Sequence, residues 1–444
     1  MSSIFGVLTK RGKLKPEVIK EIILFHKANG PDGWGAVVDG KLVRNYEYKV
    51  EIDECSCILC HTLLKINDDE LQPIPINNSF LSFDGCVFSS LTNSVNQHGI
   101  FEAVKAADGE FSIWHYKEGR VTLLRDSVGT RPLFYGVNKN FFAFSSVKDA
   151  LHRLGIMNIT SLKPGDALIY DGKMKIDTCN PLSTPSFSLE PTSLLKDELK
   201  EAVLRSVEKR VKGVKKVGVL FSSGVDSALI AHLAKNFDSE LFLYCTGTES
   251  CEDVRCASQF AKKIGLDVEP ITLSEEQVIE YYKKLRSLLP SSELMRIELA
   301  IPIFICSEHA KKDGVRVLLS GQGAEELFVG YDRYVQCFRR GGNLRKMLFE
   351  ELKALHSKDL ENNWYVASMN QCQLRYPFLD TEVIRVATSI KPEFNLKGGK
   401  KVVLREISKE MGLPPEISGR PKKAVQYGSG IHKTLIRALR KGLV

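Results

Sequence analysis

The most constraining feature of the sequence is a short polar loop between an apolar strand and an apolar helix. Residues 217–221 (Val-Gly-Val-Leu-Phe) predict a buried strand, and residues 228–235 predict a helix. Between them lies the loop 222–227, Ser-Ser-Gly-Val-Asp-Ser. Small residues let backbone N–H groups approach a phosphate, and the start of the next helix favours an anion. The loop therefore predicts a phosphate site, and the alternative is an ordinary strand–turn–helix connection.

A second loop of this kind begins at Ser320. The strand predicted at residues 315–319 leads into Ser-Gly-Gln-Gly-Ala-Glu-Glu, so two carboxylates follow its carboxyl end. Ligands of open α/β sheets bind at that edge. Asp226 and Glu325 could then share Mg²⁺, which would neutralise a pyrophosphate leaving group. The alternative is that both carboxylates only cap helix starts.

The organisation of the chain changes at residues 180–193, which hold three Pro and four Ser with little periodicity. Before this segment, short strands alternate with turns. After it, strands alternate with helices, which predicts a parallel sheet covered by helices. We therefore expect a first domain over residues 1–180, a linker over 181–193 and a second domain over 194–444.

Composition excludes several classes of protein. With 444 residues, 43% hydrophobic and 26% charged, the chain is neither generally disordered nor limited to one core. It has no apolar run of the ~18 residues that span a bilayer, and its start lacks the pattern of a secretory signal. Eleven Cys, an odd and sparse set, fit a reducing compartment. We expect a cytoplasmic protein without a membrane partner.

A cluster of cysteines raises the question of a metal. Cys55, Cys57 and Cys60 lie close together, with His61 adjacent and Cys86 further on. One interpretation is a metal or iron–sulfur site. The other is small apolar side chains on a buried strand, which we favour because no second closely spaced Cys pair follows.

Two further segments complete a recognisable set: Leu-Arg-Tyr-Pro-Phe-Leu-Asp at 374–380 and Lys-Val-Val-Leu-Arg at 401–405. With the two loops, they make the chain similar to the glutamine-dependent asparagine synthetase family. The resemblance implies an α+β Ntn-hydrolase-like domain of the class II glutamine amidotransferase type. It also implies an α/β parallel-sheet domain of the PP-loop ATP pyrophosphatase (adenine nucleotide alpha hydrolase-like) fold. In that family the second domain adenylates a carboxylate, usually that of aspartate, and ammonia displaces AMP.

The resemblance also implies roles for individual residues. The pyrophosphate would be held by the loop residues Ser222, Ser223, Gly224, Val225, Asp226 and Ser227. The adenosine-contacting positions would be Phe221, Thr246, Ser320 and Gly321. Lys401 matches the lysine near the adenylate, and its alternative is one more surface charge in a basic tail. We expect Lys401 and Glu325 to be catalytic, Asp226 and Glu325 to bind metal, and ATP and Mg²⁺ to be cofactors.

The N-terminal region departs from the family at its catalytic positions. The family places a cysteine nucleophile after the initiator Met, and Ser2 stands there. The arginine before Gly-Pro-Asp is Asn29, and the arginine for the glutamine carboxylate is Leu63. The family's Asn-Gly-Glu is replaced by Asp84, Gly85 and Cys86, and a carboxylate repels a developing oxyanion. These losses predict a retained scaffold without glutaminase activity.

The second domain departs less. Ser223 replaces the usual first glycine of its loop, which requires backbone angles that tolerate a Cβ atom. The Thr-Thr-x-Arg-Ala-Ser segment thought to recognise aspartate has no counterpart, and residues 295–300 (Met-Arg-Ile-Glu-Leu-Ala) stand there. The run Arg420-Pro421-Lys422-Lys423 also admits a plain interpretation as solvated surface. ATP chemistry is thus better supported than the identity of the acceptor acid.

These observations predict an AMP-forming ligase that amidates a carboxylate, by default aspartate, with ammonia that is free or delivered by a partner glutaminase. A homodimer is one arrangement open to it. The alternatives are a PP-loop ligase with another acceptor, an RNA-modifying enzyme, and a nucleotide-binding pseudoenzyme that acts as an interaction partner. Residues 391–444 carry 13 basic and four acidic side chains, which favours RNA, but no recognisable RNA-binding module is present.

Overall fold

The computed structural model describes residues 2–67, 69–249, 251–289, 293–420 and 428–443. By their contacts the residues form two compact units. Unit 1 comprises residues 1–182 and 355–373, and unit 2 comprises residues 183–354 and 374–444. A segment of the expected second domain, residues 355–373, therefore packs within unit 1. Patterns of local sequence do not reveal this, because it depends on contacts over more than 200 residues of chain.

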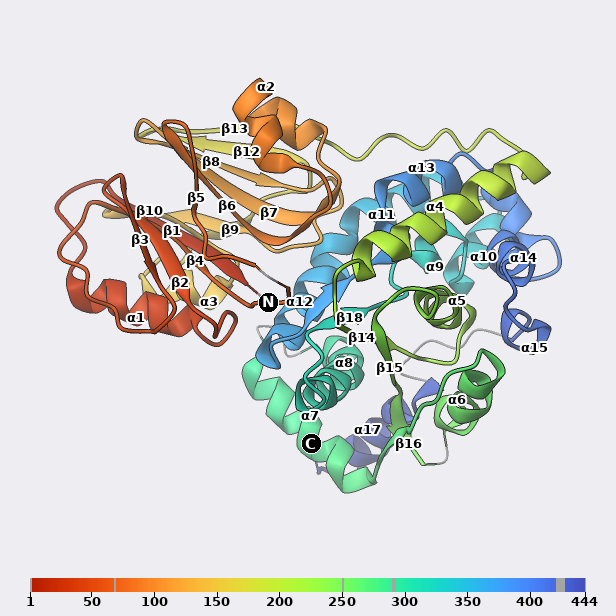
Figure 1. The fold of residues 1–444 in the computed structure, drawn as a ribbon. Coiled ribbons are helices and arrows are strands. Elements are labelled where there is room, and N and C mark those ends of the chain that lie inside the picture. The colour runs from red at the N-terminus through yellow and green to blue at the C-terminus, as the bar shows by residue number, and fades with distance from the viewer. Residues whose placement is uncertain (1, 68, 250, 290–292, 421–427, 444) are drawn as a thin grey trace. The chain divides into compact units, whose positions relative to one another are not determined.

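Unit 1 is built on two antiparallel sheets (Figure 1). The first has the strand order β11-β9-β10-β1-β4-β2-β3, and the second β13-β12-β8-β7-β6-β5. The strands of the first sheet are β1 (Ser3–Thr9), β2 (Trp34–Val38), β3 (Lys41–Asn45), β4 (Cys57–Thr62), β9 (Phe134–Val137), β10 (Phe141–Ser145) and β11 (Ile159–Ser161). Those of the second are β5 (Ile74–Ile76), β6 (Ser79–Val87), β7 (Gly109–Lys117), β8 (Arg120–Arg125), β12 (Asp166–Tyr170) and β13 (Met174–Thr178).

The two sheets share a core, because alternate residues of a strand point to opposite faces. Phe142 and Phe144 of the first sheet lie in one buried cluster with Trp114 of the second. The other face of the first sheet packs on helices α1 (Pro16–His26) and α3 (Lys148–Arg153). The other face of the second packs on α2 (Leu91–Lys105). These four layers, helix–sheet–sheet–helix, confirm the predicted Ntn-hydrolase-like fold.

Residues 355–373 are fastened to unit 1 by buried polar groups. The segment forms the π-helical turn η1 (His356–Leu360) and helix α12 (Glu361–Met369). Ser161 Oγ donates to Glu361 Oε1 at 2.6 Å, and Nη1 of the fully buried Arg125 lies 3.5 Å from that oxygen. The Trp364 indole N–H donates to Asp84 Oδ2 at 3.1 Å. These partners lie in strands of both sheets or at the ends of those strands. Helix α12 is therefore part of the interior of unit 1.

Unit 2 contains the predicted parallel sheet. Its order is β15-β14-β18-β19, and β14 runs parallel to both neighbours. A two-stranded parallel ribbon, β16 with β17, follows β15. The strands are β14 (Lys216–Leu220), β15 (Glu240–Tyr244), β16 (Thr246–Thr248), β17 (Ile271–Leu273), β18 (Val317–Leu319) and β19 (Gln373–Arg375). The alternation of strands and helices in the sequence predicted this arrangement.

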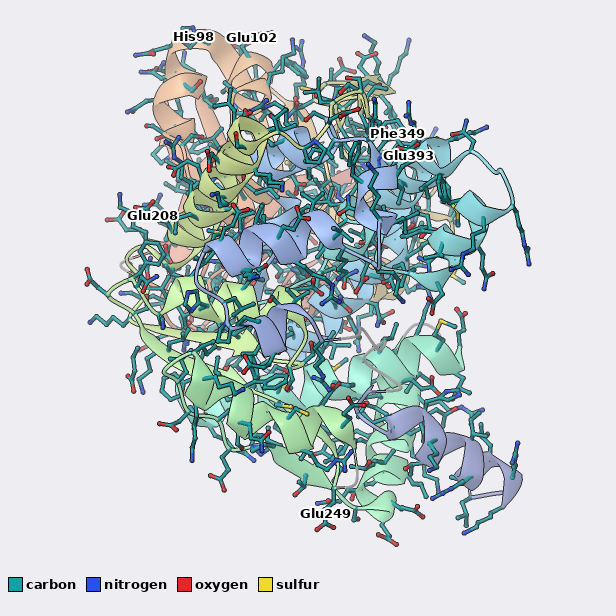
Figure 2. All side chains as sticks on the ribbon, turned by 90° about the vertical axis from the view of Figure 1, so that its right-hand side faces the viewer. His98, Glu102, Glu208, Glu249, Phe349 and Glu393 are labelled. Carbon is teal, nitrogen blue, oxygen red and sulfur yellow. The ribbon has the colours of Figure 1, made fainter. Side chains whose placement is uncertain are left out.

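Helices make up the rest of unit 2. On α4, apolar residues such as Leu199 and Val203 are buried while Glu208 points away from the fold (Figure 2). The helices are α4 (Ser193–Val211), α5 (Val225–Ala234), α6 (Glu252–Lys263), α7 (Glu275–Leu288), α8 (Leu294–Lys312), α9 (Ala324–Leu327), α10 (Asp332–Arg339), α11 (Leu344–Leu355), η2 (Pro377–Leu379), α13 (Thr381–Ala387), η3 (Pro392–Leu396), α14 (Val402–Glu410), α15 (Pro415–Ser418) and α17 (Ile431–Arg440). In the described part of the chain, no helix has the length and hydrophobicity needed to cross a membrane.

The cysteines of unit 1 do not converge on one point. Cys57 packs against the core between the sheets, whereas Cys55 and Cys60 lie in the core under α1. Burial raises the pKa of the Cys57 thiol to about 12. Among the described residues, no group of three or more His, Cys, Asp or Glu side chains is placed to hold a metal ion. The arrangement favours the interpretation of these cysteines as small apolar side chains.

We predict that unit 1 depends on one buried ion pair. Arg131 Nη2 lies 3.2 Å from Glu110 Oε2, and their side chains are 0% and 1% exposed. Glu110→Gln should lower the free energy of unfolding by about 3–5 kcal/mol, because it leaves the Arg131 charge buried without its counter-ion. The measurement is chemical denaturation followed by tryptophan fluorescence, since all three Trp residues lie in unit 1.

The matched control for this prediction is Glu21→Gln. Glu21 pairs with Arg153 at 3.0 Å, but both side chains are at least half exposed. An exposed pair of this kind contributes about 0–1 kcal/mol. Equal losses in the two variants would contradict a special role for the buried pair.

Candidate functional site

The loop 222–227 has the geometry of an anion-binding turn. The backbone N–H of Ser222 donates to Ser227 Oγ at 3.1 Å, which closes the loop on itself. Ser223 adopts φ 57°, in the left-handed region where a side chain costs about 1 kcal/mol relative to glycine. Its hydroxyl donates to the Asp253 carbonyl at 3.1 Å. The serine therefore takes the conformation of the glycine it replaces, and this hydrogen bond offsets part of the strain.

Arg420 anchors this loop from the far end of the chain. Its Nη1 donates to the Ser223 carbonyl at 2.9 Å, and its Nη2 lies 3.1 Å from Asp253 Oδ1. The side chain is only 9% exposed. The interpretation of Arg420 as solvated surface is therefore wrong, and Pro421, Lys422 and Lys423 lie outside the described residues. A basic run gives no sign of such a contact, because the partners are 167 and 197 residues away.

The centre of the candidate site is a buried cluster of three charges. Lys401 Nζ lies 2.7 Å from both carboxylate oxygens of Asp226 and 2.9 Å from Glu325 Oε1. The Lys401 side chain is fully buried, and both carboxylates are nearly so. The alternative interpretation of Lys401 as a charge in a solvated tail is thus excluded. The structure brings together the three residues expected to act in catalysis or metal binding.

Backbone geometry holds this cluster in place. Lys401 immediately precedes helix α14 and has φ 58°, in the left-handed region. A Cβ atom on Gly330 would lie 1.6 Å from Glu325 Oε2 and 2.4 Å from Lys401 Cε. A side chain at position 330 is therefore incompatible with the cluster. Burial lowers the pKa of Arg405, one turn further along α14, and the charges of Asp226 and Glu325 partly offset that effect.

The residues expected to contact adenosine lie at one edge of the sheet. Phe221 and Ser320 directly follow β14 and β18, and Thr246 begins β16, one residue after β15. The Ser320 N–H donates to the Arg375 carbonyl at 3.0 Å, and Thr246 Oγ1 donates to the Ile271 carbonyl at 2.9 Å. Parallel strands end together, so this is the carboxyl edge where α/β sheets bind ligands. No described contact joins Thr246 to the loop, so that part of the site stays a prediction.

The buried carboxylates fit a magnesium ion. Asp226 and Glu325 both reach one ammonium group, so their oxygens already converge. Magnesium in phosphate-transferring sites takes one or two carboxylates and completes its shell with water and phosphate oxygens. A pair of carboxylates beside an anion-binding loop meets that requirement without a third protein ligand.

The segment expected to recognise the acceptor has a different character. Glu298 stands at the family's arginine position, in helix α8, and is 2% exposed. Both of its carboxylate oxygens lie 3.0–3.1 Å from Nδ1 of His432 in α17. No local sequence pattern predicts this pairing, because the two residues lie 134 positions apart. The pair shows that a carboxylate, already matched by a histidine, occupies this position.

The altered positions of unit 1 lie in a close-packed environment. Ser2 Oγ accepts a hydrogen bond from the Leu64 N–H at 3.1 Å. Leu63, two per cent exposed, accepts a hydrogen bond through its carbonyl from the Asp32 N–H at 3.0 Å. Asn29 is buried as well. The segment that holds Asn29 and Asp32 therefore lies against the end of β4, next to Ser2. This proximity is expected if the altered positions belong to one pocket.

Asp84 is the most unusual of these residues. It is fully buried, and while Oδ2 accepts the Trp364 N–H, Oδ1 has no hydrogen-bond partner among the described residues. Burial raises the pKa of the carboxyl to about 6, although the nearby Arg131 charge and the Trp364 hydrogen bond act in the opposite direction. The role of the carboxylate in this structure is therefore to accept a hydrogen bond from helix α12.

The fold and this geometry define a class of protein. The chain combines a four-layer Ntn-hydrolase-like unit with a unit built on a parallel sheet. Family profiles agree: the profile described as asparagine synthase matches residues 198–341 and 336–443, and that of a glutamine amidotransferase domain matches residues 80–153. The chain belongs to the asparagine synthetase family, a family of ATP-dependent ligases.

Individual relatives support the same assignment. A Methanocaldococcus jannaschii protein, named as a glutamine-hydrolysing asparagine synthetase, is 31% identical over 520 residues, covering 99% of this chain and 96% of that protein. The glutamine-hydrolysing asparagine synthetase 2 of Lotus japonicus is 27% identical, covering 74% of this chain and only 57% of its own length. The phosphoribosylpyrophosphate amidotransferase of B. subtilis is 16% identical with a TM-score of 0.35, over 56% of this chain and 67% of that chain, a similarity too weak to argue from.

We predict that Asp84 makes unit 1 less stable as the pH rises. Folding favours the protonated acid, because the pKa is about 6 in the fold against 3.8 for the free side chain. Stability should therefore fall between about pH 4 and pH 6, by roughly 3 kcal/mol in total. Asp84→Asn removes the titration while its amide oxygen can still accept the Trp364 hydrogen bond.

The measurement is denaturation followed by tryptophan fluorescence from pH 4 to pH 7. Relative to wild type, Asp84→Asn should gain stability across that range, whereas the exposed Asp53→Asn should not. A constant difference between Asp84→Asn and wild type would contradict the raised pKa.

Proposed function

We propose that the chain is an AMP-forming amide ligase, which adenylates a carboxylate with ATP so that ammonia can displace AMP. The observation that carries this proposal is the buried cluster of Lys401, Asp226 and Glu325 beside the anion-binding loop. A site of this kind concentrates opposite charges where a pyrophosphate group would leave. An ordinary strand–turn–helix connection has no need for three charges out of water, each of which costs free energy to bury.

In this proposal each group has a physical task. The loop 222–227 binds the phosphates through backbone N–H groups at the start of α5. Lys401 stabilises negative charge that develops as the carboxylate attacks the α-phosphate, since a compact cation in a dry site acts strongly. Asp226 and Glu325 hold Mg²⁺, which as a Lewis acid lowers the charge on the leaving pyrophosphate. Arg405 adds positive charge to the same region.

We propose further that the nitrogen arrives as ammonia and not from glutamine hydrolysed in unit 1. Ser2, Leu63 and Asp84 replace the nucleophile, the carboxylate-binding arginine and the oxyanion contact that the family resemblance implies. Their structural roles support this: Ser2 Oγ accepts a backbone hydrogen bond, and Asp84 binds Trp364. Unit 1 would then act as a scaffold, and ammonia would come from solution or from a separate glutaminase.

Aspartate is the default acceptor, but the site supports a different acid equally well. The Glu298–His432 pair stands where the family resemblance places an aspartate-binding arginine. A panel of carboxylates in an assay of pyrophosphate release, with ATP, Mg²⁺ and ammonia, would identify the acceptor. Release that requires RNA and no small acid would favour the RNA-modifying alternative, and no release at all would favour the pseudoenzyme.

We predict that Asp226→Asn abolishes pyrophosphate release, with a fall of at least about 100-fold. The change removes a charge that we propose binds the metal. It keeps the side-chain volume and leaves Glu325 in contact with Lys401, so the fold should persist. The control is Asp332→Asn, which removes an exposed carboxylate whose partner is Lys400 in the same unit. Unchanged release in Asp226→Asn would refute the assignment of this carboxylate to the metal.

We predict that unit 1 does not hydrolyse glutamine. Glutamate release should be absent in wild type and also in Ser2→Cys, because Leu63 cannot form the paired hydrogen bonds that an arginine makes to a carboxylate. The assay measures glutamate with and without ATP, beside pyrophosphate release driven by ammonia. Release by wild type would show that Ser2 is a working nucleophile, and release by Ser2→Cys alone would show that only the thiol was missing.

A further inference from the structure

The Lys401 ammonium contacts both carboxylates that would hold a metal ion, those of Asp226 and Glu325. Its ammonium makes three short contacts, at 2.7, 2.7 and 2.9 Å, all to oxygens of these two carboxylates. The two contacts with Asp226 are hydrogen bonds, and the third is an ion-pair contact with Glu325. One cation thus already neutralises much of the charge that would attract a second.

We propose that Lys401 excludes free divalent cations from the Asp226–Glu325 pair, so that the metal enters only together with nucleotide phosphates. This inference rests on the proposed function, because it assigns an order of binding to the same site. A divalent ion at the two carboxylates would lie within a few ångströms of the ammonium, where like charges repel strongly. Phosphate oxygens would give the ammonium another partner and so relieve that repulsion.

In the described part of the chain, the contacts of the ammonium are all with these two carboxylates. The Lys401 side chain is 0% exposed, so it cannot turn into water as a surface lysine does. Its backbone is fixed in the left-handed region, and Gly330 leaves room for its Cε atom and for Glu325 Oε2. The guanidinium of Arg405 interacts electrostatically with both carboxylates and adds to the positive potential around them. These features hold the lysine between its partners, so the exclusion is built into the fold.

The test is a titration of the nucleotide-free protein with Mn²⁺, a paramagnetic substitute for Mg²⁺, followed by electron paramagnetic resonance of the free ion. Lys401→Met keeps the length of the side chain and removes its charge. We expect its affinity for Mn²⁺ to rise at least about tenfold over wild type, since one contacting positive charge is removed. The double variant Lys401→Met/Asp226→Asn should lose this gain, because it also lacks a ligand.

The matched control is Lys400→Met. Lys400 is the adjacent residue, but its ammonium pairs with the exposed carboxylate of Asp332 at 2.8 Å. Removing this charge should leave the Mn²⁺ affinity at the wild-type value. Equal Mn²⁺ affinity in Lys401→Met and wild type would overturn the proposal, as would an equal gain in Lys400→Met.

Lys401→Met also removes a cation that contacts two buried carboxylates, so the variant can be unstable. In that case the readout is thermal unfolding with and without millimolar Mg²⁺. The metal should restore Tm in Lys401→Met and change it little in wild type or Lys400→Met, because it replaces the missing charge. A destabilised variant that Mg²⁺ does not rescue would refute the exclusion.

Neither readout depends on turnover, so this inference and the proposed function can fail separately. Tighter Mn²⁺ binding in Lys401→Met without pyrophosphate release by wild type would support the exclusion and reject the ligase. Pyrophosphate release by wild type without any gain in Mn²⁺ affinity would support the ligase and reject the exclusion.

Discussion

The contact of Lys401 with Asp226 and Glu325 is the interaction on which the arrangement of unit 2 depends. It joins the start of α5, the short helix α9 after β18, and the start of α14, three elements separated by 76–175 residues of chain. Such a cluster is weak evidence for stability, because the cost of burying the charges can exceed their attraction. A chemical role explains its burial better, because such a role requires positive and negative groups together in a site from which water is excluded.

Unit 1 presents the opposite case, a complete fold in which the residues at the expected glutaminase positions differ from those that the resemblance implies. Its strands, sheet order and cores are complete, and only side chains at the expected glutaminase positions differ. The order of the chain gives a reason to keep this unit, because residues 355–373 interrupt unit 2 in sequence but pack in unit 1. Without residues 1–182, Trp364 and Leu360 would lose their buried surroundings, and Glu361 would lose Ser161 and Arg125.

Local sequence predicted a large part of this structure. The strand before Ser222, the helix after it and the strand before Ser320 appear as expected, because hydrophobic periodicity and small-residue loops encode elements directly. The place of Lys401 in the charged cluster could be predicted only from the family resemblance, since Lys401 lies 175 residues from Asp226. Arg420, Trp364 and the Glu298–His432 pair were missed or misread, because their partners are set by folding over long distances and leave no mark on local pattern.

These long-range contacts also indicate which inferences from the family resemblance have physical support in this chain and which do not. The backbone of the anion-binding loop survives the change of glycine to Ser223, because a left-handed φ and one hydrogen bond accommodate the side chain. The segment that the resemblance matches to the aspartate-recognition motif differs, because it holds Glu298, whose carboxylate pairs with His432. A loop that binds through backbone N–H groups tolerates substitution, whereas a pocket that recognises through side-chain charge does not. The nucleotide chemistry therefore transfers with more physical support than the choice of acid or the source of nitrogen.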